Sequence, residues 1–318
     1  MIENLIKLDV VIVTFNRLEK LQHTLICYET QSQSFRNLIV VNNNSTDGTK
    51  EFLDSWKEAD TPYKKHVINM NKNLGGAGGF YEGQNYAMKM NPDWIFIADD
   101  DAYPDANMIE RFYTFLSVSN DPDHYSAICS SVYNIDDTLC TYHRQYISKP
   151  VLFKYQKVNS TESDYSQNFN IDLLSYVGAF LNTNALRQIG LVYKDYFIYY
   201  DDSEHSLRLK KYGTILCVPE IKMFHDGGLE AARGEYVTWR DYYSIRNRMH
   251  MLKKHYPLVA FSETLFYFIK KPLGYVKRLF VKEKVKGLNK IKQEALMDAW
   301  RNKLGVHEIY KPGWTFYE

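Results

Sequence analysis

The stretch Trp94–Asp101 constrains the fold more than any other part of the chain. Its sequence is Trp-Ile-Phe-Ile-Ala-Asp-Asp-Asp, so five apolar residues lead directly into three consecutive aspartates. The first half predicts a short buried strand, but three adjacent carboxylates repel one another unless a cation or a bound partner neutralises them. A strand that delivers acids to its carboxyl end fits an open α/β sheet, where ligands gather at that edge. Taken alone, the stretch also fits an Asp-rich turn that closes a strand.

Strands and helices alternate before this stretch. Runs of aliphatic residues predict strands at 9–14, 37–41 and 66–70. Apolar residues at helical spacing predict a helix after each of the first two strands, and a third helix is expected to end at about Met90. This alternation predicts an α/β fold with a Rossmann-like, mostly parallel sheet flanked by helices.

The middle of the chain carries a weaker pattern. A helix is predicted from about Asp105, and the following residues to about Gln167 are Tyr-rich and without periodicity, apart from a strand near 127–132. A short helix at 185–190 ends in a glycine stop. We therefore expect much of the section before Gln167 to be irregular.

A second acidic node follows an aromatic run. Asp201 and Asp202 stand at the start of a predicted helix that ends near Gly213. Acids in this place are partly explained by capping and by the helix dipole. Capping needs only one acid, however, and not a pair plus Glu204. Further along, His225 precedes a Gly-rich turn, where a lone histidine is more often structural than a ligand.

The Gly-rich segment Asn73–Phe80 contains Gly75, Gly76, Gly78 and Gly79. It does not complete a dinucleotide-binding fingerprint, because Tyr81 occupies the last required glycine and the segment follows the third strand instead of the first. A dehydrogenase is therefore disfavoured. The glycines are better explained by close passage of the backbone along a bound nucleotide sugar, or by a tight helix entry.

Charge is distributed unevenly along the 318 residues. Between Lys270 and Lys303 there are eleven Lys/Arg against three Asp/Glu, and because the whole chain has 39 and 38, the remainder has 28 basic and 35 acidic residues. We expect residues 257–318 to form a helical, basic and amphipathic extension. The preceding residues 1–256 are expected to form the main domain, in two halves at 1–116 and 117–256.

Apolar and basic residues interleave beyond about Phe261, which suits a helix lying in an anionic membrane interface. A solvated basic helix that packs on the domain is the alternative, and no nucleic-acid-binding motif is present. Truncation at this point is expected to leave the main domain folded. The helix before it, from about Tyr236, is expected to carry a polar face, made by Arg240, Arg246, Asn247 and Arg248.

The expected location is the cytoplasm, at the inner face of the cell membrane. Four scattered cysteines suggest neither a zinc ribbon nor a disulfide framework. The first residues lack the apolar core of a signal peptide, and no run of about 18 apolar residues suggests a transmembrane helix.

Taken together, these motifs resemble the GT-A-type glycosyltransferases of family 2, over roughly Asp9 to Arg248. Val11–Arg17 looks like the first nucleotide-binding strand and loop of that family, Asn42–Thr49 like its second, and Asp99–Asp101 like its metal-binding DXD motif. The branch is indicated by the Gly-rich segment, the Asp-Asp helix start and His225. These features, in this order, resemble the bacterial galactofuranosyltransferases.

The resemblance implies a role for each matching residue. The metal ligands would be Asp99, Asp101 and His225. The donor-binding residues would be Thr14, Asn16, Arg17, Asn42, Asn73, Gly75, Gly76 and Asp100. Asp202 would be the general base, and Asp201 would orient the acceptor. Asn42 departs from the pattern, because many relatives have Asp facing the uracil imide, yet its amide oxygen can still accept that hydrogen bond.

The implied enzyme is an inverting glycosyltransferase (a hexosyltransferase) that uses Mn²⁺ or Mg²⁺. We expect it to transfer galactofuranose from UDP-galactofuranose to a glycan or lipid-linked glycan acceptor of a capsule, O-antigen or exopolysaccharide. Nucleic acid is not an expected partner. A rhamnosyltransferase that uses dTDP-rhamnose is the first alternative. A catalytically inactive module that binds sugar nucleotides or glycans is the second.

Overall fold

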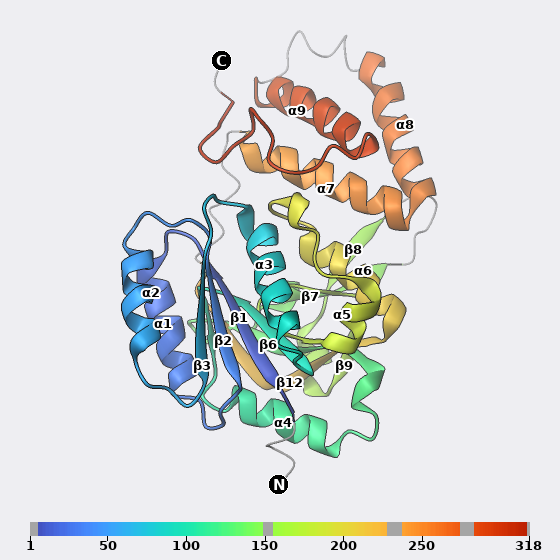
Figure 1. Cartoon of the computed structure of the whole chain (residues 1–318). Helices are drawn as coiled ribbons and strands as arrows, with labels where there is room; N and C mark the ends of the chain where they lie inside the picture. Colours follow the sequence, from blue (N-terminus) through green and yellow to red (C-terminus); the bar gives the residue numbers. More distant parts are fainter. Residues whose placement is uncertain (1–5, 149–154, 228–236, 274–282, 317–318) are drawn as a thin grey trace.

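Four parallel strands form one half of the main sheet in the computed structural model, which describes residues 6–148, 155–227, 237–273 and 283–316. Their order is β3-β2-β1-β4 (Figure 1). The strands are β1 (Leu8–Thr14), β2 (Asn37–Asn42), β3 (Lys64–Asn69) and β4 (Trp94–Asp99). The helices that connect them are α1 (Leu18–Glu29), α2 (Thr49–Glu58) and α3 (Gly75–Lys89). The predicted Rossmann-like arrangement is confirmed.

The second half of the main sheet mixes directions. Beyond β4 the order continues as β11-β6-β12-β5, and β9 pairs with β12. β11 runs antiparallel to both β4 and β6, whereas β12 runs parallel to β6. The strands are β5 (Ala102–Pro104), β6 (Tyr125–Asn134), β9 (Phe169–Ile171), β11 (Ala179–Asn182) and β12 (Thr214–His225). The helices are α4 (Met108–Val118), α5 (Thr183–Ile189) and α6 (Asp201–Tyr212).

The expectation of an irregular section before Gln167 was wrong in part. A separate antiparallel sheet in the order β10-β7-β8 takes two strands from this section, β7 (Arg144–Ser148) and β8 (Gln156–Asn159), and a third, β10 (Leu173–Leu174), from beyond it. These strands carry little apolar alternation, because β7 is mostly half-buried and β8 is mostly exposed. Their pairing depends on partners distant in sequence, which a local pattern does not reveal. Short 3₁₀ helices lie at Pro122–His124, Thr141–His143, Glu162–Ser166 and Lys194–Tyr196.

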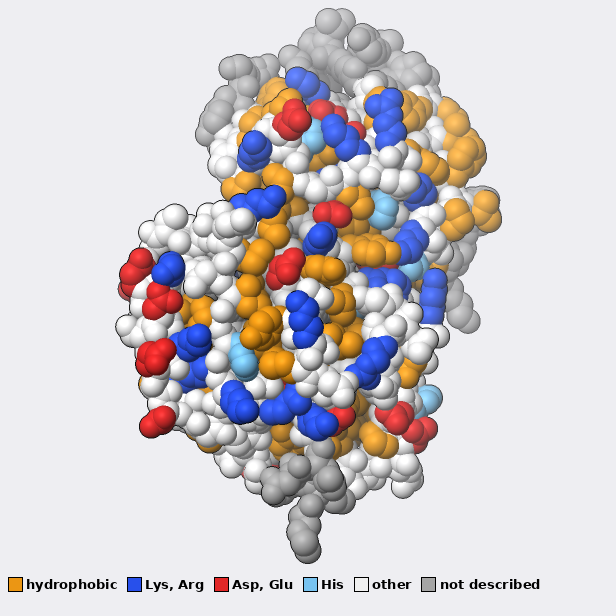
Figure 2. All heavy atoms as spheres, in the orientation of Figure 1, with side chains coloured by type: hydrophobic (Ala, Val, Ile, Leu, Met, Phe, Trp, Pro, Cys, Tyr) orange, Lys and Arg blue, Asp and Glu red, His pale blue; other side chains and the backbone are white. Residues whose placement is uncertain are grey.

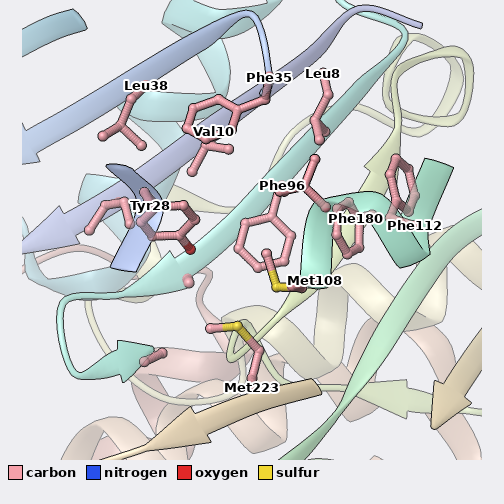
Figure 3. Close-up of a cluster of buried hydrophobic side chains, with 14 of the residues drawn as sticks. Leu8, Val10, Tyr28, Phe35, Leu38, Phe96, Met108, Phe112, Phe180 and Met223 are labelled. Carbon is pink, nitrogen blue, oxygen red and sulfur yellow. The ribbon is translucent and has the colours of Figure 1, made fainter. Parts of the chain in front are cut away.

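Side chains of the main sheet alternate between two cores. In β1, Val10 and Ile12 pack with residues from α1, α2 and α4, whereas Val11 and Val13 pack with residues from α3, α5 and α6. This is the period-2 alternation expected for a strand that is covered on both faces. Figure 3 shows part of the first core. There the ring of Phe180 stacks on Phe112 at a centroid distance of 3.8 Å.

The C-terminal part adds a group of three helices beside the sheet (Figure 1). They are α7 (Trp239–His255), α8 (Pro257–Leu273) and α9 (Glu283–Trp300). Buried residues of α8 and α9 share clusters with α7. The expected polar face of α7 was wrong for Arg246 and Asn247, which are fully buried. Within the described residues, no helix is long and apolar enough to cross a membrane.

Candidate active site

The three acids lie where the sequence predicts, at the carboxyl end of β4. Register pairs Asp99 with Val13 of β1, so the residues that follow β1 lie beside those that follow β4. Thr14 donates a hydrogen bond from Oγ1 to Asp100 at 2.7 Å. The guanidinium of Arg17 lies 3.1 Å from Asp100 and 2.6 Å from Asp101. The β1 loop therefore supplies one positive charge and one hydroxyl donor, and these are shared between two of the three carboxylates.

The pKa values of these acids are pushed apart. Burial and the neighbouring carboxylates of Asp101 and Asp100 raise the pKa of Asp99 well above its ordinary value. Burial raises the pKa of Asp100 to about 6, against the opposing charge of Arg17. Burial also acts to raise the pKa of Asp101, but a hydrogen bond from His225 and the charge of Arg17 outweigh it, so that pKa is lowered. Of the three carboxyl groups, ionisation is therefore most strongly opposed at Asp99.

His225 reaches the same place from the end of β12. Its Nε2 lies 3.5 Å from Oδ1 of Asp101, and β12 continues into Asp226, whose backbone N–H donates to the Asp101 carbonyl at 2.8 Å. The sequence analysis did not single out Asp226, which pairs with Lys20 at 3.1 Å. Its position directly after His225 was the available signal. The structure therefore brings Asp101 and His225 together across more than a hundred residues.

The donor set suits a divalent cation. Carboxylate oxygens and an imidazole nitrogen are ligands of Mn²⁺, and a cation would relieve the repulsion that raises the pKa of Asp99. A buried nitrogen nearby supports a polar ligand environment. Nε2 of His143 has no hydrogen-bond partner among the described residues, and the ring of His143 packs edge-on against His225 at a centroid distance of 5.1 Å. Asp99, Asp101 and His225 offer donor atoms of the kind that the predicted metal binds, and their role as its ligands stays a prediction.

A different cluster meets a stricter geometric test. Within the described part of the chain, the one group of three candidate ligands whose atoms all lie within 4.8 Å of one another is Glu294, Asp298 and His307. Nδ1 of His307 accepts the backbone N–H groups of Ile309 and Tyr310. Nε2 therefore carries the proton and faces Glu294 at 3.3 Å. This cluster is a hydrogen-bonded support between the C-terminal residues and α9, and its tautomer disfavours metal binding.

The residues predicted to hold the nucleotide are engaged with one another. Asn42 is buried at the end of β2, where its Oδ1 accepts the N–H of Ser45 and its Nδ2 donates to Asn69 at 2.9 Å. The side chain of Asn16, which has a φ of 53°, accepts the N–H of Thr46 at 2.7 Å. One lone pair of the Asn42 amide oxygen stays available for a base. These contacts join the loops after β1 and β2 into one surface.

A second link joins the β2 loop to the Gly-rich segment. Asn73 accepts the N–H of Gly75 at 2.7 Å and the Nδ2 of Asn43 at 3.1 Å, and Asn43 also bonds Gly75 and Leu74. Asn43 was missed in the sequence analysis, although it lies within the Asn-rich turn that follows β2. Through Asn43, two predicted donor loops hold each other in place.

Protein packing accounts for most of the glycines. A Cβ at Gly75, where φ is +72°, would lie 2.0 Å from the carbonyl oxygen of Phe197. One at Gly78 would meet Leu74 at 2.3 Å, and one at Gly79 would meet Val13 at 2.4 Å. Among the four glycines of this segment, Gly76 is the one where an added Cβ would meet nothing within 4 Å. Open space for a ligand, as the sequence analysis suggested for the whole segment, is therefore found at Gly76.

The second acidic node begins α6 as expected. Asp201 is buried, and its burial together with the carboxylate of Asp202 raises its pKa to about 7. Asp202 is half-buried and accepts the N–H and Oγ of Ser203 at 2.5 and 3.0 Å. Glu204 has a different task, because it is buried between Arg208 at 2.8 Å and His255 at 2.9 Å. The third acid of the node is therefore structural, whereas the first two lie at the helix start.

Lys157 is a further charged residue near this pair. It comes from β8, in the small sheet that the sequence analysis missed, and its Nζ donates to Ser203 at 2.6 Å. Its ammonium also lies 4.4 Å from the centroid of the Tyr200 ring. Burial lowers the pKa of Lys157, while the charges of Asp202 and Asp201 oppose this. The small sheet thus places a cation beside the acids of α6.

The chain is similar to several known sugar transferases. It is 26% identical to galactofuranosyltransferase GlfT1 of Mycolicibacterium smegmatis over 264 residues, which cover 77% of this chain and 82% of the relative. It is 25% identical to the dTDP-rhamnosyl transferase RfbF of Shigella flexneri over 276 residues, 80% of this chain and 84% of that protein. Both similarities extend well beyond the first half of the sheet.

Solved structures share the fold at lower identity. TarS 1–349 of S. aureus superposes with a TM-score of 0.55 at 15% identity, and the match covers 92% of this chain and 81% of the TarS chain. The mannosyltransferase PcManGT of Pyrobaculum calidifontis, in complex with GDP-Man and Mn²⁺, gives a TM-score of 0.56 at 14% identity, with 93% and 86% covered. These neighbours are GT-A glycosyltransferases, so the predicted fold class is confirmed.

The family model for glycosyl transferase family 2 matches residues 9–190. This range contains the carboxyl ends of β1, β2 and β4, the three acids and the Gly-rich segment, and it agrees with the resemblance read from the sequence motifs. The chain is therefore a glycosyltransferase that belongs to glycosyl transferase family 2.

Proposed function

We propose that this chain is an inverting, divalent-metal-dependent glycosyltransferase that transfers galactofuranose from UDP-galactofuranose to a cell-surface glycan. One observation carries the proposal. Asp99 at the end of β4 and Asp201 at the start of α6 lie close enough that the charge of Asp201 contributes to the raised pKa of Asp99. The acids that bind the metal of the leaving diphosphate and the acids that contact the acceptor must both lie near the anomeric carbon. The nearness of the two acidic nodes supports such an arrangement.

Asp202 is the proposed general base, with Asp201 orienting the acceptor. The acceptor hydroxyl loses a proton as it attacks, so a carboxylate is needed opposite the leaving group. Asp202 is the more exposed of the two, whereas Asp201 is buried and its raised pKa makes it a weaker choice for an acid that stays ionised. A single displacement of this kind inverts the anomeric centre, by the same stereochemical logic that governs inverting glycosidases.

The β1 and β4 loops would hold the donor. A Mn²⁺ or Mg²⁺ ion bound by Asp99, Asp101 and His225 would neutralise charge on the departing diphosphate. Arg17 and Thr14 keep Asp100 and Asp101 in place, so the proposed donor role of Asp100 is to support this edge. Asn16, Asn42, Asn73, Gly75 and Gly76 complete the proposed donor surface, with Gly76 offering the open side.

Galactofuranose is preferred over rhamnose as the donor sugar on two features. The open space at Gly76 suits a furanose with its exocyclic diol, and the Asp201-Asp202 pair resembles the galactofuranosyl branch. Selection must act on the sugar, because uracil and thymine differ by one methyl group, which discriminates by about 1–3 kcal/mol at most. A dTDP-rhamnose-dependent rhamnosyltransferase is the second candidate, favoured by the similarity to RfbF.

The test is a transfer assay on one lipid-linked or oligosaccharide acceptor with UDP-galactofuranose, UDP-galactopyranose or dTDP-rhamnose, each with Mn²⁺, with Mg²⁺ and in excess EDTA. We expect turnover with UDP-galactofuranose, little with UDP-galactopyranose, and Mn²⁺ at least as effective as Mg²⁺, because an imidazole ligand favours manganese. Asp101→Ala should abolish turnover. Transfer from dTDP-rhamnose alone would move the assignment to the second candidate, and full activity in EDTA would contradict the metal.

The C-terminal extension is proposed to attach the enzyme to the cytoplasmic leaflet, where a lipid-linked acceptor would lie. One face of α8 is exposed and apolar, made by Leu258, Phe261, Leu265, Phe268 and Ile269. Figure 2 shows hydrophobic side chains along the outer edge of the helical part where α8 lies. Apolar area of this kind beside a basic segment supports interfacial binding.

A further inference from the structure

The loop that enters α6 has an unusual backbone. Phe197, Tyr199 and Tyr200 all have a positive φ, at 67°, 66° and 64°, and none of them is glycine. Such conformations are unfavourable for L-residues and persist only where the surroundings fix them. Because Asp201 follows Tyr200 directly, this loop determines where the two acids begin.

One side chain of α7 holds the loop. Asn247 is fully buried, and its Nδ2 lies 2.9, 2.8 and 2.9 Å from the carbonyl oxygens of Tyr196, Ile198 and Tyr199, so the two hydrogens of the amide are shared among three acceptors. Nε of Arg246 donates to Oδ1 of Asn247 at 2.9 Å. That bond fixes the orientation of the amide, because it places the oxygen toward Arg246 and leaves the NH₂ group facing the loop.

Asn247 contacts loop residues that lie nearer in sequence to Asp201 than those contacted by its neighbour Arg246. Arg246 donates to the carbonyl oxygens of Asp195, Tyr196 and Gly305, so it secures the beginning of the loop and the C-terminal residues. Asn247 is bonded to the two residues beyond Phe197, within three positions of Asp201. Its amide therefore acts on the part of the loop with the positive φ values.

The same loop also contacts the proposed donor surface. The carbonyl of Phe197 accepts the N–H of Ala77 at 3.2 Å, and Gly75 is packed against that carbonyl so closely that a Cβ would not fit. A shift of the loop would thus move the acids of α6 relative to the Gly-rich segment. Displacements on the order of 1 Å at a reacting centre can cost about 10²-fold in rate.

We propose that Asn247 is a positioning residue for the reaction. It does not touch the substrate; it holds the loop 197–200, with its positive φ at Phe197, Tyr199 and Tyr200, in the conformation that places Asp201 and Asp202 against the donor surface. This inference rests on the proposed role of Asp202 as the base. No motif around Asn247 in the sequence indicates this role.

The test is a double-mutant cycle of Asn247→Ala with Asp202→Asn, measured on folded protein below the transition temperature of each variant. We expect Asn247→Ala to lower kcat by about 10²-fold with a smaller change in donor KM, and to have little further effect once the base is gone, because residues that act through one another are not additive. Asn247→Gln, which keeps an amide donor on a longer side chain, should recover part of the rate.

The matched control is Asn182→Ala. Asn182 is also a buried amide, which caps α5 and donates to the Tyr125 carbonyl at 3.1 Å, and its loss should lower stability while kcat is retained. Either of two results would overturn the proposal. One is an unchanged kcat in folded Asn247→Ala, and the other is that Asn247→Ala lowers kcat by the same factor in the wild type and in Asp202→Asn. A full rate in Asp202→Asn alone would instead remove the proposed base, and the cycle repeated on Asp201→Asn then decides the role of Asn247 by the same criterion.

Discussion

Asp201, which is not one of the predicted metal ligands, is an acid whose pKa the fold changes strongly. Its pKa rises from 3.8 to about 7 through burial and the neighbouring Asp202 carboxylate. Between these two pH values the folded chain keeps a proton that the unfolded chain has lost. The contribution of Asp201 to the free energy of unfolding therefore falls as the pH rises from about 4 to about 7, and then stays constant.

Asp201→Asn removes this dependence. The amide keeps the shape and cannot ionise, so we expect the variant to melt at a higher temperature than the wild type at pH 8, by at least a few degrees at about 2–4 °C per kcal/mol. The difference should vanish near pH 4. Thermal unfolding in EDTA across this range measures it, with Asp54→Asn as the control, because Asp54 is an exposed partner of Lys50. An increase in melting temperature that is the same at every pH would contradict the raised pKa of Asp201.

The first turn of α3 shows why neighbouring glycines are not equivalent. Gly75 has a φ of +72° and lies against the carbonyl of Phe197, whereas an added Cβ at Gly76 meets open space. The Gly-rich segment therefore serves two purposes. One glycine allows close contact with the loop that enters α6, and the next leaves room on the proposed donor side.

Two alanine substitutions separate these purposes. Gly75→Ala should lower the melting temperature and the rate of transfer, because a left-handed φ costs an L-residue about 1–2 kcal/mol and the Cβ displaces the Phe197 carbonyl. Gly76→Ala should leave stability unchanged or raise it by about 0.4–1 kcal/mol, with any kinetic effect in the donor KM. Thermal unfolding and steady-state kinetics of the pair measure both. Equal losses of stability would refute the distinction.

The apolar face of α8 permits a direct test of membrane attachment. The double variant Phe261→Asp with Leu265→Asp should bind anionic liposomes at least about 100-fold more weakly, because burying each such side chain contributes about 1.5–3 kcal/mol. The control is Val118→Asp with Ile135→Asp, which alters two exposed apolar residues of the α/β part. Liposome flotation measures binding of both. Equal binding by the two double variants would show that α8 is not the attachment surface.

At the scale of the whole molecule, α8 and α9 share buried clusters with α7, the helix that precedes them. Val259 and Ala260 of α8 and Leu296 and Ala299 of α9 are buried with residues of α7, and Arg246 donates to the carbonyl of Gly305. Removing residues 257–318 would expose this face and release a support of the loop before α6. The division at residue 256 and the folding of the truncated domain stay predictions, and buried residues from both sides of residue 256 share one cluster.

The sequence predicted the elements whose patterns are local. β1, β2 and β4 are aliphatic runs followed by turn or acidic residues, and their parallel order follows from the alternation with helices. The small sheet that supplies Lys157 was missed, because β7 and β8 are stabilised by partners far along the chain. Asn247 was assigned to the polar face of its helix, and its burial was missed for the same reason. Its carbonyl partners lie about 50 residues earlier, and helical spacing says nothing of them.

The site was predicted to a similar extent. The acids of β4 and α6 and His225 could be named from motifs, and the structure brings Asp101 and His225 to 3.5 Å. What the motifs did not supply is the way the site is supported. Arg17 spans two acids, Asn43 joins two donor loops and Asn247 holds the entry to α6, and each of these contacts depends on tertiary structure.

The most direct test of the proposed mechanism is the transfer rate of Asp202→Asn at saturating UDP-galactofuranose and Mn²⁺. The amide keeps the shape of the side chain and cannot accept the acceptor proton. We predict a kcat lower by about 10²–10⁴-fold with the donor KM nearly unchanged, because loss of a general base acts on the chemical step. A rate close to that of the wild type, with the loss found in Asp201→Asn instead, would contradict the assignment and exchange the two roles.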